Sequence, residues 1–279
     1  MTRPIQRVGH IGDTDNRFCG APVFAELAGS TVNSTDLLAR AFGMPMLSDD
    51  DREVLRCIAL AAVSPDARVW PLKMTRTLSS YGNPFAGFFG AQLGTASDRM
   101  GPGTASSSAA SLAWIRARVG DEPSDQAVAA AVTEHLASAG RIPGFGVPMR
   151  AEDERLLGLR QLLAGHPAMQ RPYWRLSLQV IAAVRAGGGP PPNVVIALAT
   201  LLLDLGLPAH RAGMFVTMVM APTFAAHALE ASEQDAAALQ EITAVDDRTT
   251  APRRTAAAAA ADRVPVGGSA MPARRSLAW

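Results

Sequence analysis

Hydroxyl side chains follow a glycine-rich turn near the middle of the sequence. The turn covers residues 101–104, and Ser106, Ser107 and Ser108 come after it in a stretch whose small residues favour a helix. The first N–H groups of a helix have no partner within the helix, and together with hydroxyl groups they can bind an anion. No Gly-Lys-Ser/Thr sequence follows, so this is not the pattern of a P-loop. The alternative interpretation is a helix whose small residues allow close packing on its neighbour.

Charged residues surround a second interrupted stretch, residues 141–148. Two prolines and two glycines prevent this stretch from being helical throughout. Asp153 then stands at the start of the next predicted helix, with Arg150 before it and Arg155 after it. The arginines could contact an anionic ligand, as could Arg99 before the first turn. Charges at the start of a helix are also common on solvated surfaces, and both interpretations stay open.

The histidines and cysteines predict neither a metal site nor a reactive thiol. The five histidines show no i, i+4 pair of the kind that binds zinc. We expect His135, next to Glu134 on an amphipathic helix, to be exposed. Cys19 and Cys57 lack the spacing of a metal or redox motif, and Cys57 lies on an apolar helix face. A reducing, cytoplasmic location is the simplest interpretation.

The composition indicates a soluble, helical protein. Alanine, the best helix former, supplies much of the apolar content, and aromatic residues make up only 5% of the 279 residues. The net charge of +1 gives no reason to expect a nucleic acid or an anionic membrane as a partner. The N-terminus lacks the apolar segment of a signal peptide. The most apolar stretch, residues 194–203, is too short to span a bilayer.

Helices predicted from hydrophobic spacing must position the candidate residues. Ser48 can cap one of them, because three aspartates follow it at the positive end of the helix dipole. Residues 1–20 show no sustained period. Beyond Thr243 the chain is rich in Pro, Arg and Gly, so we expect a flexible tail. The predicted helices begin near Pro22 and then cover about 49–64, 66–96 (a hairpin broken at 82–84), 105–118, 123–140, 152–164, 172–185, 193–205 and 208–231.

Four stretches, in the same order along the chain, resemble motifs of citrate synthase and of the citryl-CoA lyase domain of ATP-citrate lyase. One Gly-Phe-Gly sequence is a weak signal, whereas four matches in order are far less expected by chance. The stretches are Gly20–Gly29 followed by Phe42-Gly43-Met44-Pro45, Ser97–Pro102 (compare G-D-R-F-G-G), Gly140–Gly146 followed by Glu152–Arg155 (compare P-G-F-G-H and D-P-R), and Pro192-Asn193-Val194 with Ala226–Glu230 (compare P-N-V and A-H-x-x-E).

The resemblance implies an all-α, citrate synthase-like fold with two domains. Residues 20–96 and 206–243 would form a large helical domain, and residues 97–205 would form a smaller domain inserted into it. Residues 1–19 would be an N-terminal extension and residues 244–279 the flexible tail. Members of this family are dimers, so the resemblance also implies a homodimer, or a heterodimer with a paralogue.

The resemblance further implies chemistry on a coenzyme A thioester and an oxoacid, without a metal. In the family a carboxylate removes a proton from the acyl group, histidines stabilise the enolate and polarise the carbonyl, and arginines bind the oxoacid. Asp153 matches the family's base, and Arg155 matches the arginine after it. However, Val147 stands in place of a catalytic histidine, residues 100–108 contain no histidine, and Met220 stands in place of a substrate-binding arginine.

These matches and departures lead to three hypotheses. The first is an enzyme that makes or breaks a carbon–carbon bond, with Asp153 as base and residues 97–108 stabilising the enolate. The second is a catalytically degenerate member that binds coenzyme A or pairs with a paralogue, as a regulatory or structural subunit. The third is a helical scaffold that binds no ligand. For the hypotheses with a ligand, the expected coenzyme A or substrate contacts are Arg99, Ser106, Ser107, Arg150 and Arg155.

Overall fold

The computed structural model shows a mostly helical chain, as the sequence predicts. It describes residues 8–11, 14–28, 32–63, 66–67, 69–94, 101–147 and 151–236. These residues belong to one compact unit that extends to Gln240, and the predicted tail lies outside the described residues. The division of this unit into a large and a small domain stays a prediction.

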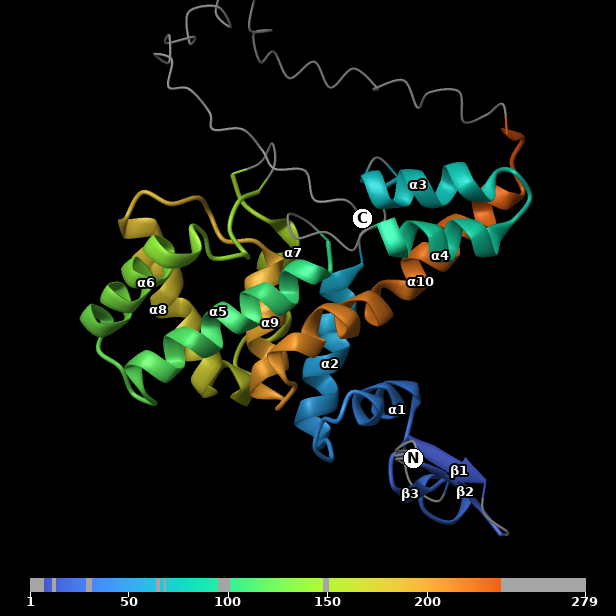
Figure 1. The fold of residues 1–279 in the computed structure, drawn as a ribbon, viewed down its shortest axis with the longest axis horizontal. Helices are drawn as coiled ribbons and strands as arrows, with labels where there is room; N and C mark the ends of the chain where they lie inside the picture. Colours follow the sequence, from blue (N-terminus) through green and yellow to red (C-terminus); the bar gives the residue numbers. More distant parts are fainter. Residues whose placement is uncertain are drawn as a thin grey trace, which may run out of the picture. The chain divides into compact units, whose positions relative to one another are not determined.

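The helices follow the predicted order, and most predicted ends agree with the structure to within two residues (Figure 1). Two 3-10 helices, Pro167–Gln170 and Ala209–Arg211, precede α8 and α10, and a single π-helical turn covers Val23–Leu27. The α-helices of the described part are α1 (Ser34–Ala41), α2 (Asp49–Ala62), α3 (Trp70–Ser79), α4 (Pro84–Gly94), α5 (Gly103–Val119), α6 (Asp125–Ala139), α7 (Glu154–Leu162), α8 (Pro172–Ala186), α9 (Val194–Asp204) and α10 (Ala212–Ser232).

The first helices begin where the sequence supplies caps. Before α2, the Ser48 hydroxyl accepts a hydrogen bond from the N–H of Asp51, and the Asp51 carboxylate accepts one from the N–H of Ser48. Asn33 and Asp36 form the same reciprocal pair before α1. A cap of this kind stabilises a helix by about 1 kcal/mol. The cap predicted at Ser48 is therefore confirmed.

A small antiparallel sheet precedes the helices, and the sequence analysis did not predict it. The strands β1 (Gly9–Ile11), β2 (Asn16–Phe18) and β3 (Ala21–Pro22) pair in chain order. The carboxylate of Asp15 accepts hydrogen bonds from the N–H groups of Phe24 and Ala25, which anchors the following turn. Strands of two or three residues are too short to produce a readable alternation of apolar and polar residues.

Helix α9 runs through the main core. Its side chains from Ile196 to Leu202 are all buried, and it packs between α5 and α8 while also contacting α2 and α7. The core is filled mainly by Leu, Ile, Val and Ala, and its largest fully buried side chains are Trp174, Phe215, Leu112, Ile115, Leu159 and Leu201. Because α9 is covered on several sides, its sequence is apolar throughout instead of amphipathic.

A second, smaller core lies where the α3–α4 hairpin packs against the later part of α10. It is built from Leu72, Ala91 and Phe224. The hairpin approaches closely at Gly87, because a Cβ atom there would lie only 2.4 Å from the carbonyl oxygen of Thr75. The predicted hairpin with a break at 82–84 is thus confirmed.

Helix α10 connects the two cores. With the turn before it, the segment Ala209–Ser232 is long and apolar enough to cross a membrane by length and composition, a test that core helices of soluble proteins also pass. It packs against α2, α3, α4 and α5, and 39% of its most apolar window is buried. Even so, Met214 and Leu229 remain 65% and 58% exposed, so part of its apolar surface is uncovered in the single chain.

Candidate functional site

The glycine-rich segment 141–147 pairs with the residues in front of α9. The N–H of Asn193 donates to the carbonyl oxygen of Gly144 (2.8 Å), and the Asn193 amide donates to the carbonyl oxygen of Gly146 (2.9 Å). The N–H of Gly146 in turn donates to the carbonyl oxygen of Pro191 (2.7 Å). Two of the stretches that carry the family resemblance, far apart in sequence, are therefore in direct contact.

Gly144 permits this contact because it has no side chain. Its φ of +104° lies in the region that favours glycine. A Cβ atom at this position would lie 2.7 Å from Cβ and 2.9 Å from the backbone nitrogen of Ile196 in α9. The glycine thus sets how closely the segment approaches the central helix.

The carboxylate of Asp153 lies buried between α7 and α9, and only 3% of the residue is exposed. Its Oδ1 accepts hydrogen bonds from the N–H of Arg155 (3.0 Å) and from Nε of Arg155 (3.2 Å). Its Oδ2 accepts hydrogen bonds from Nη2 of Arg155 (3.1 Å) and from the N–H of Val194 (2.9 Å). Asp153 is therefore the N-cap of α7 and also holds the first residue of α9.

The surroundings of Asp153 keep its carboxylate ionised. Burial acts to raise its pKa, but the hydrogen bonds from the Arg155 guanidinium and the Val194 N–H outweigh burial, and the pKa lies below the ordinary value. A lower pKa makes a carboxylate a weaker base. The solvated first turn considered from the sequence is wrong for this residue, and whether Asp153 acts as a base stays a prediction.

The structure does not gather the other residues predicted to contact a ligand into one site around Asp153. Arg155 is bound to Asp153, with 36% of its side chain exposed. Val147 is half-buried and has no group that can donate a proton or hydrogen bond. Arg99 and Arg150 lie outside the described residues.

The start of α5 packs closely against the start of α10. The Ser106 hydroxyl accepts a hydrogen bond from the N–H of Gly213 (2.8 Å) and donates one to the carbonyl oxygen of His210 (3.2 Å). A Cβ atom on Gly213 would lie 2.9 Å from the carbonyl oxygen of Pro102. Ser106 therefore joins two helices, as the close-packing interpretation of this stretch expects, whereas Ser107 is exposed.

A cavity of about 290 Å³ opens at this junction. Among the described residues that line it, none is charged and Asp153 does not occur, so the structure does not bring the two predicted parts of the site into one cavity. Sequence reasoning missed its contributions from α4 and α10, because no local motif marks them. The lining residues are Gln92, Pro102, Gly103, Ser106, Gly213, Met214 and Thr217.

The predicted A-H-x-x-E stretch of α10 contacts α3. The guanidinium of Arg76, a buried residue, donates to the carboxylate of Glu230 (3.0 Å) and to the side-chain oxygen of Gln234 (2.9 Å), and it lies 3.4 Å from Nδ1 of His227. The histidine and glutamate of this motif thus fasten the hairpin to α10. Met220, also on α10, is partly buried and packs against both cores.

His135 is buried, so the prediction that it is exposed is wrong. Its Nε2 lies 3.0 Å from the hydroxyl of Ser111, and its ring lies 5.0 Å from that of Trp114, both on α5. Burial lowers the pKa of His135, which favours the neutral form. The amphipathic pattern of α6 did not reveal that α5 covers this position.

Asp204, the last residue of α9, is a half-buried acid that the sequence analysis missed. Its two oxygens accept hydrogen bonds from the N–H groups of Tyr173 (2.9 Å) and Trp174 (2.9 Å) in the first turn of α8. Burial raises its pKa to about 6, although these N–H groups and the nearby Arg171 act to lower it. The only sequence signal is an acid at the end of an apolar run.

The described residues contain no group of three or more His, Cys, Asp or Glu side chains that could hold a metal ion. Cys19 and Cys57 are both free thiols, and burial raises the pKa of Cys57. The Arg56 guanidinium, 4.0 Å from the Cys57 sulfur, acts in the opposite direction but does not outweigh burial.

Comparison with solved structures identifies the fold. The chain is similar to citryl-CoA lyase from Hydrogenobacter thermophilus, with a TM-score of 0.71, 14% identity and coverage of 98% of this chain and 96% of that chain. It is also similar to ATP citrate lyase from Methanothrix soehngenii in complex with citrate and coenzyme A, with a TM-score of 0.66, 14% identity and coverage of 82% of this chain and 39% of that chain.

Citrate synthase from Thermoplasma acidophilum, in a ternary complex with carboxymethyl coenzyme A and oxaloacetate, matches with a TM-score of 0.54, 12% identity and coverage of 89% of this chain and 60% of that chain. No protein-family model and no curated protein sequence matches the chain. The protein therefore has a citrate synthase-like fold. The resemblance found in the sequence motifs is confirmed at the level of the fold.

Proposed function

We propose that this protein binds a coenzyme A thioester through a citrate synthase-like fold and is catalytically degenerate, serving as a regulatory or structural subunit. The similarity to solved proteins bound to coenzyme A supports the ligand class. The residues present support the loss of chemistry.

The observation that carries this proposal is the environment of Asp153. Removing a proton next to a thioester needs a carboxylate with a free lone pair and donors aimed at the developing enolate oxygen. Both oxygens of Asp153 are already hydrogen-bonded to Arg155 and Val194. Val147, which matches a family histidine, supplies no donor. Both oxygens of the candidate base, Asp153, therefore already accept hydrogen bonds, and a valine stands where the family has a histidine.

Two measurements on the wild-type protein test the proposal. Calorimetric titration with coenzyme A and with acetyl-CoA should detect binding. Incubation of acetyl-CoA with the protein in heavy water, followed by proton NMR, should show no exchange of the methyl protons beyond the buffer rate. Protein-dependent exchange would overturn the loss of chemistry, and no binding to either compound would favour the scaffold without a ligand.

An enzyme with Asp153 as base is the second candidate. Its support is the position of the carboxylate, buried between α7 and the start of α9 next to the Gly-Phe-Gly segment. In this case the wild type would exchange the protons of some acyl-CoA, and Asp153→Asn would abolish the exchange. Coenzyme A binding by the variant is the control, because a variant that still binds but does not exchange has lost the base and not the fold.

We further propose that the protein forms a homodimer through the uncovered apolar side of α4 and α10. Phe85, Phe89 and Leu93 recur every four residues on α4, so they share one helix face, and they are 70%, 55% and 78% exposed. Met214 on α10 is also exposed (65%), and it lines the same cavity as Gln92, the neighbour of Leu93 in the sequence of α4. Exposed apolar side chains grouped in this way are typical of an interface.

Analytical ultracentrifugation tests the dimer. The wild type should sediment as a dimer, and Phe89→Glu should shift it to the monomer because the charge would be buried in the interface. Leu162→Glu, at a 45% exposed position on α7, is the matched control and should remain dimeric. A wild-type monomer would contradict the homodimer and favour pairing with a paralogue.

A further inference from the structure

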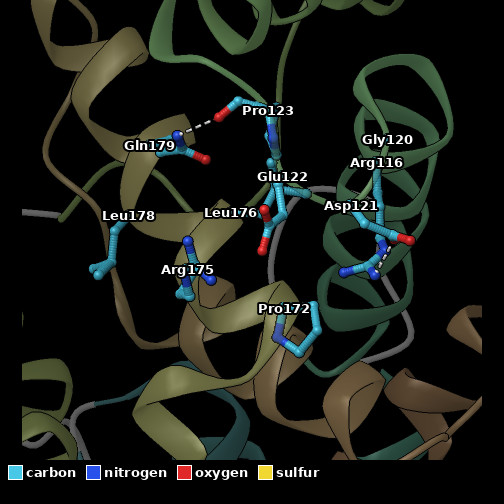
Figure 2. Close-up of a pocket in the computed structure, with 10 residues that line it drawn as sticks. All are labelled: Arg116, Gly120, Asp121, Glu122, Pro123, Pro172, Arg175, Leu176, Leu178 and Gln179. Atoms are coloured by element: carbon cyan, nitrogen blue, oxygen red, sulfur yellow. Dashed lines mark hydrogen bonds and ion pairs between the residues drawn. The ribbon is translucent and has the colours of Figure 1, made fainter.

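A second and larger cavity lies between the end of α5, the turn into α6, and α8. Its volume is about 630 Å³. Figure 2 shows it open between two walls, one formed by α8 and the other by the end of α5 and residues 120–123. The proposed function uses none of its residues. The cavity at the start of α5 lies at the opposite end of this 17-residue helix, so the two are separate sites.

Side-chain bonds hold both walls in place. Gln179 of α8 donates to the carbonyl oxygen of Pro123 (3.1 Å) and to the carboxylate of Asp125 (2.8 Å), which ties the turn to α8. Arg116 of α5 donates to the carboxylate of Asp121 (2.5 Å). A cavity whose walls are already fixed loses little conformational entropy when a ligand binds.

Two opposite charges in this cavity have no partner. In the part of the chain that the structure describes, the side chains of Arg175 and Glu122 form no hydrogen bond or ion pair. In Figure 2, Arg175 and Glu122 lie beside the open middle of the view, Arg116 lies to their right and Pro172 lies below. Arg116 is held by Asp121 and lies 4.7 Å from the ring centre of Tyr173, so it is fixed in position.

We propose that this cavity binds a free α-amino acid. Its carboxylate pairs with the guanidinium of Arg175, which can donate two parallel hydrogen bonds, and lies within the field of Arg116. Its ammonium group pairs with the carboxylate of Glu122. Its side chain lies against the apolar surfaces of Pro172 and Leu176.

The charges of the cavity select this class. The four ionised lining residues comprise Arg116, Arg175, Asp121 and Glu122, so the site has no net charge. A ligand with several negative charges would be repelled by the free carboxylate, and a simple cation would be repelled by the free guanidinium. A zwitterion satisfies both free groups at once.

Calorimetric titration of the full-length protein tests the proposal with the twenty protein amino acids as probes, and with acetate and ethylamine as probes that carry only one of the two charges. At least one amino acid should bind more tightly than either single-charge probe. Arg175→Gln and Glu122→Gln should each weaken that binding by about 10- to 100-fold, because each removes one charge-assisted contact.

The variants Arg160→Gln on α7 and Glu233→Gln after α10 are the matched controls and should bind as the wild type does. Acetate should lose binding only with Arg175→Gln. The proposal is overturned if no amino acid binds at a ligand concentration of about 10 mM. A site with a dissociation constant near 1 mM would be mostly occupied at that concentration. It is also overturned if acetate binds as well as the amino acid, or if neither Arg175→Gln nor Glu122→Gln changes the affinity.

Discussion

Replacing Asp153 by asparagine removes the charge of the cap between α7 and α9 while keeping the shape of the side chain. The asparagine has one acceptor oxygen, so its amide nitrogen must face either the N–H and Nε of Arg155, or Nη2 of Arg155 and the N–H of Val194. Asparagine can still accept the capping hydrogen bond, but a buried donor without an acceptor costs about 1–3 kcal/mol. We therefore expect Asp153→Asn to lower the free energy of unfolding by about 1–3 kcal/mol.

Urea unfolding followed by circular dichroism measures this loss, and thermal unfolding should show a fall in Tm of about 2–12 °C for a chain of this size. Asp50→Asn is the control, because Asp50 is exposed in the first turn of α2 and should change stability by less than about 0.5 kcal/mol. A change in Asp153→Asn as small as that of the control would refute the assignment of Asp153 as a carboxylate that joins α7 to α9 through both of its oxygens.

The pH dependence gives a second measure of the same group. The folded-state pKa of Asp153 lies below the unfolded value, so its contribution to stability is present above the unfolded pKa and is lost as the pH falls through the folded pKa. The stability difference between wild type and Asp153→Asn should thus shrink as the solution is acidified below about pH 4. A difference that stays constant with pH would contradict this reasoning.

Two further changes test how the core is positioned. Gly144→Ala should lower the free energy of unfolding by about 2–4 kcal/mol, because the new Cβ would meet Ile196 and the φ of +104° is strained for alanine. Gly158→Ala, at a helical position with nothing within 4 Å, is its control in urea unfolding and should be neutral or stabilising. For Asp204, a folded pKa of about 6 against an ordinary 3.8 means that up to about 3 kcal/mol of stability is lost as the pH rises from about 4 to about 6. Asp204→Asn should remove this part of the pH dependence of unfolding, and an unchanged pH profile would show that the burial of Asp204 does not affect its titration.

Several features of the fold could be predicted from neighbouring residues alone. Ser48 caps α2 through Asp51, and this interaction spans only three residues. Cys57 is buried because the apolar positions around it recur with helical spacing. The Gly-Phe-Gly stretch was recognised by its resemblance to a family motif, and the structure shows that Gly144 within it has a φ of +104°, which other residues rarely adopt.

The environments of the candidate site residues were decided by contacts between distant segments. From the sequence, Asp153 could be either a base or a solvated charge, and only the fold shows that Val194, 41 residues later, supplies its fourth hydrogen bond. His135 looked exposed because its own helix cannot show that Ser111 and Trp114 of α5 cover it. The positions and caps of the helices thus followed from the sequence. The burial and the hydrogen-bond partners of the site residues were decided by the tertiary structure, because they depend on which helices pack together and not on the spacing of residues within one helix.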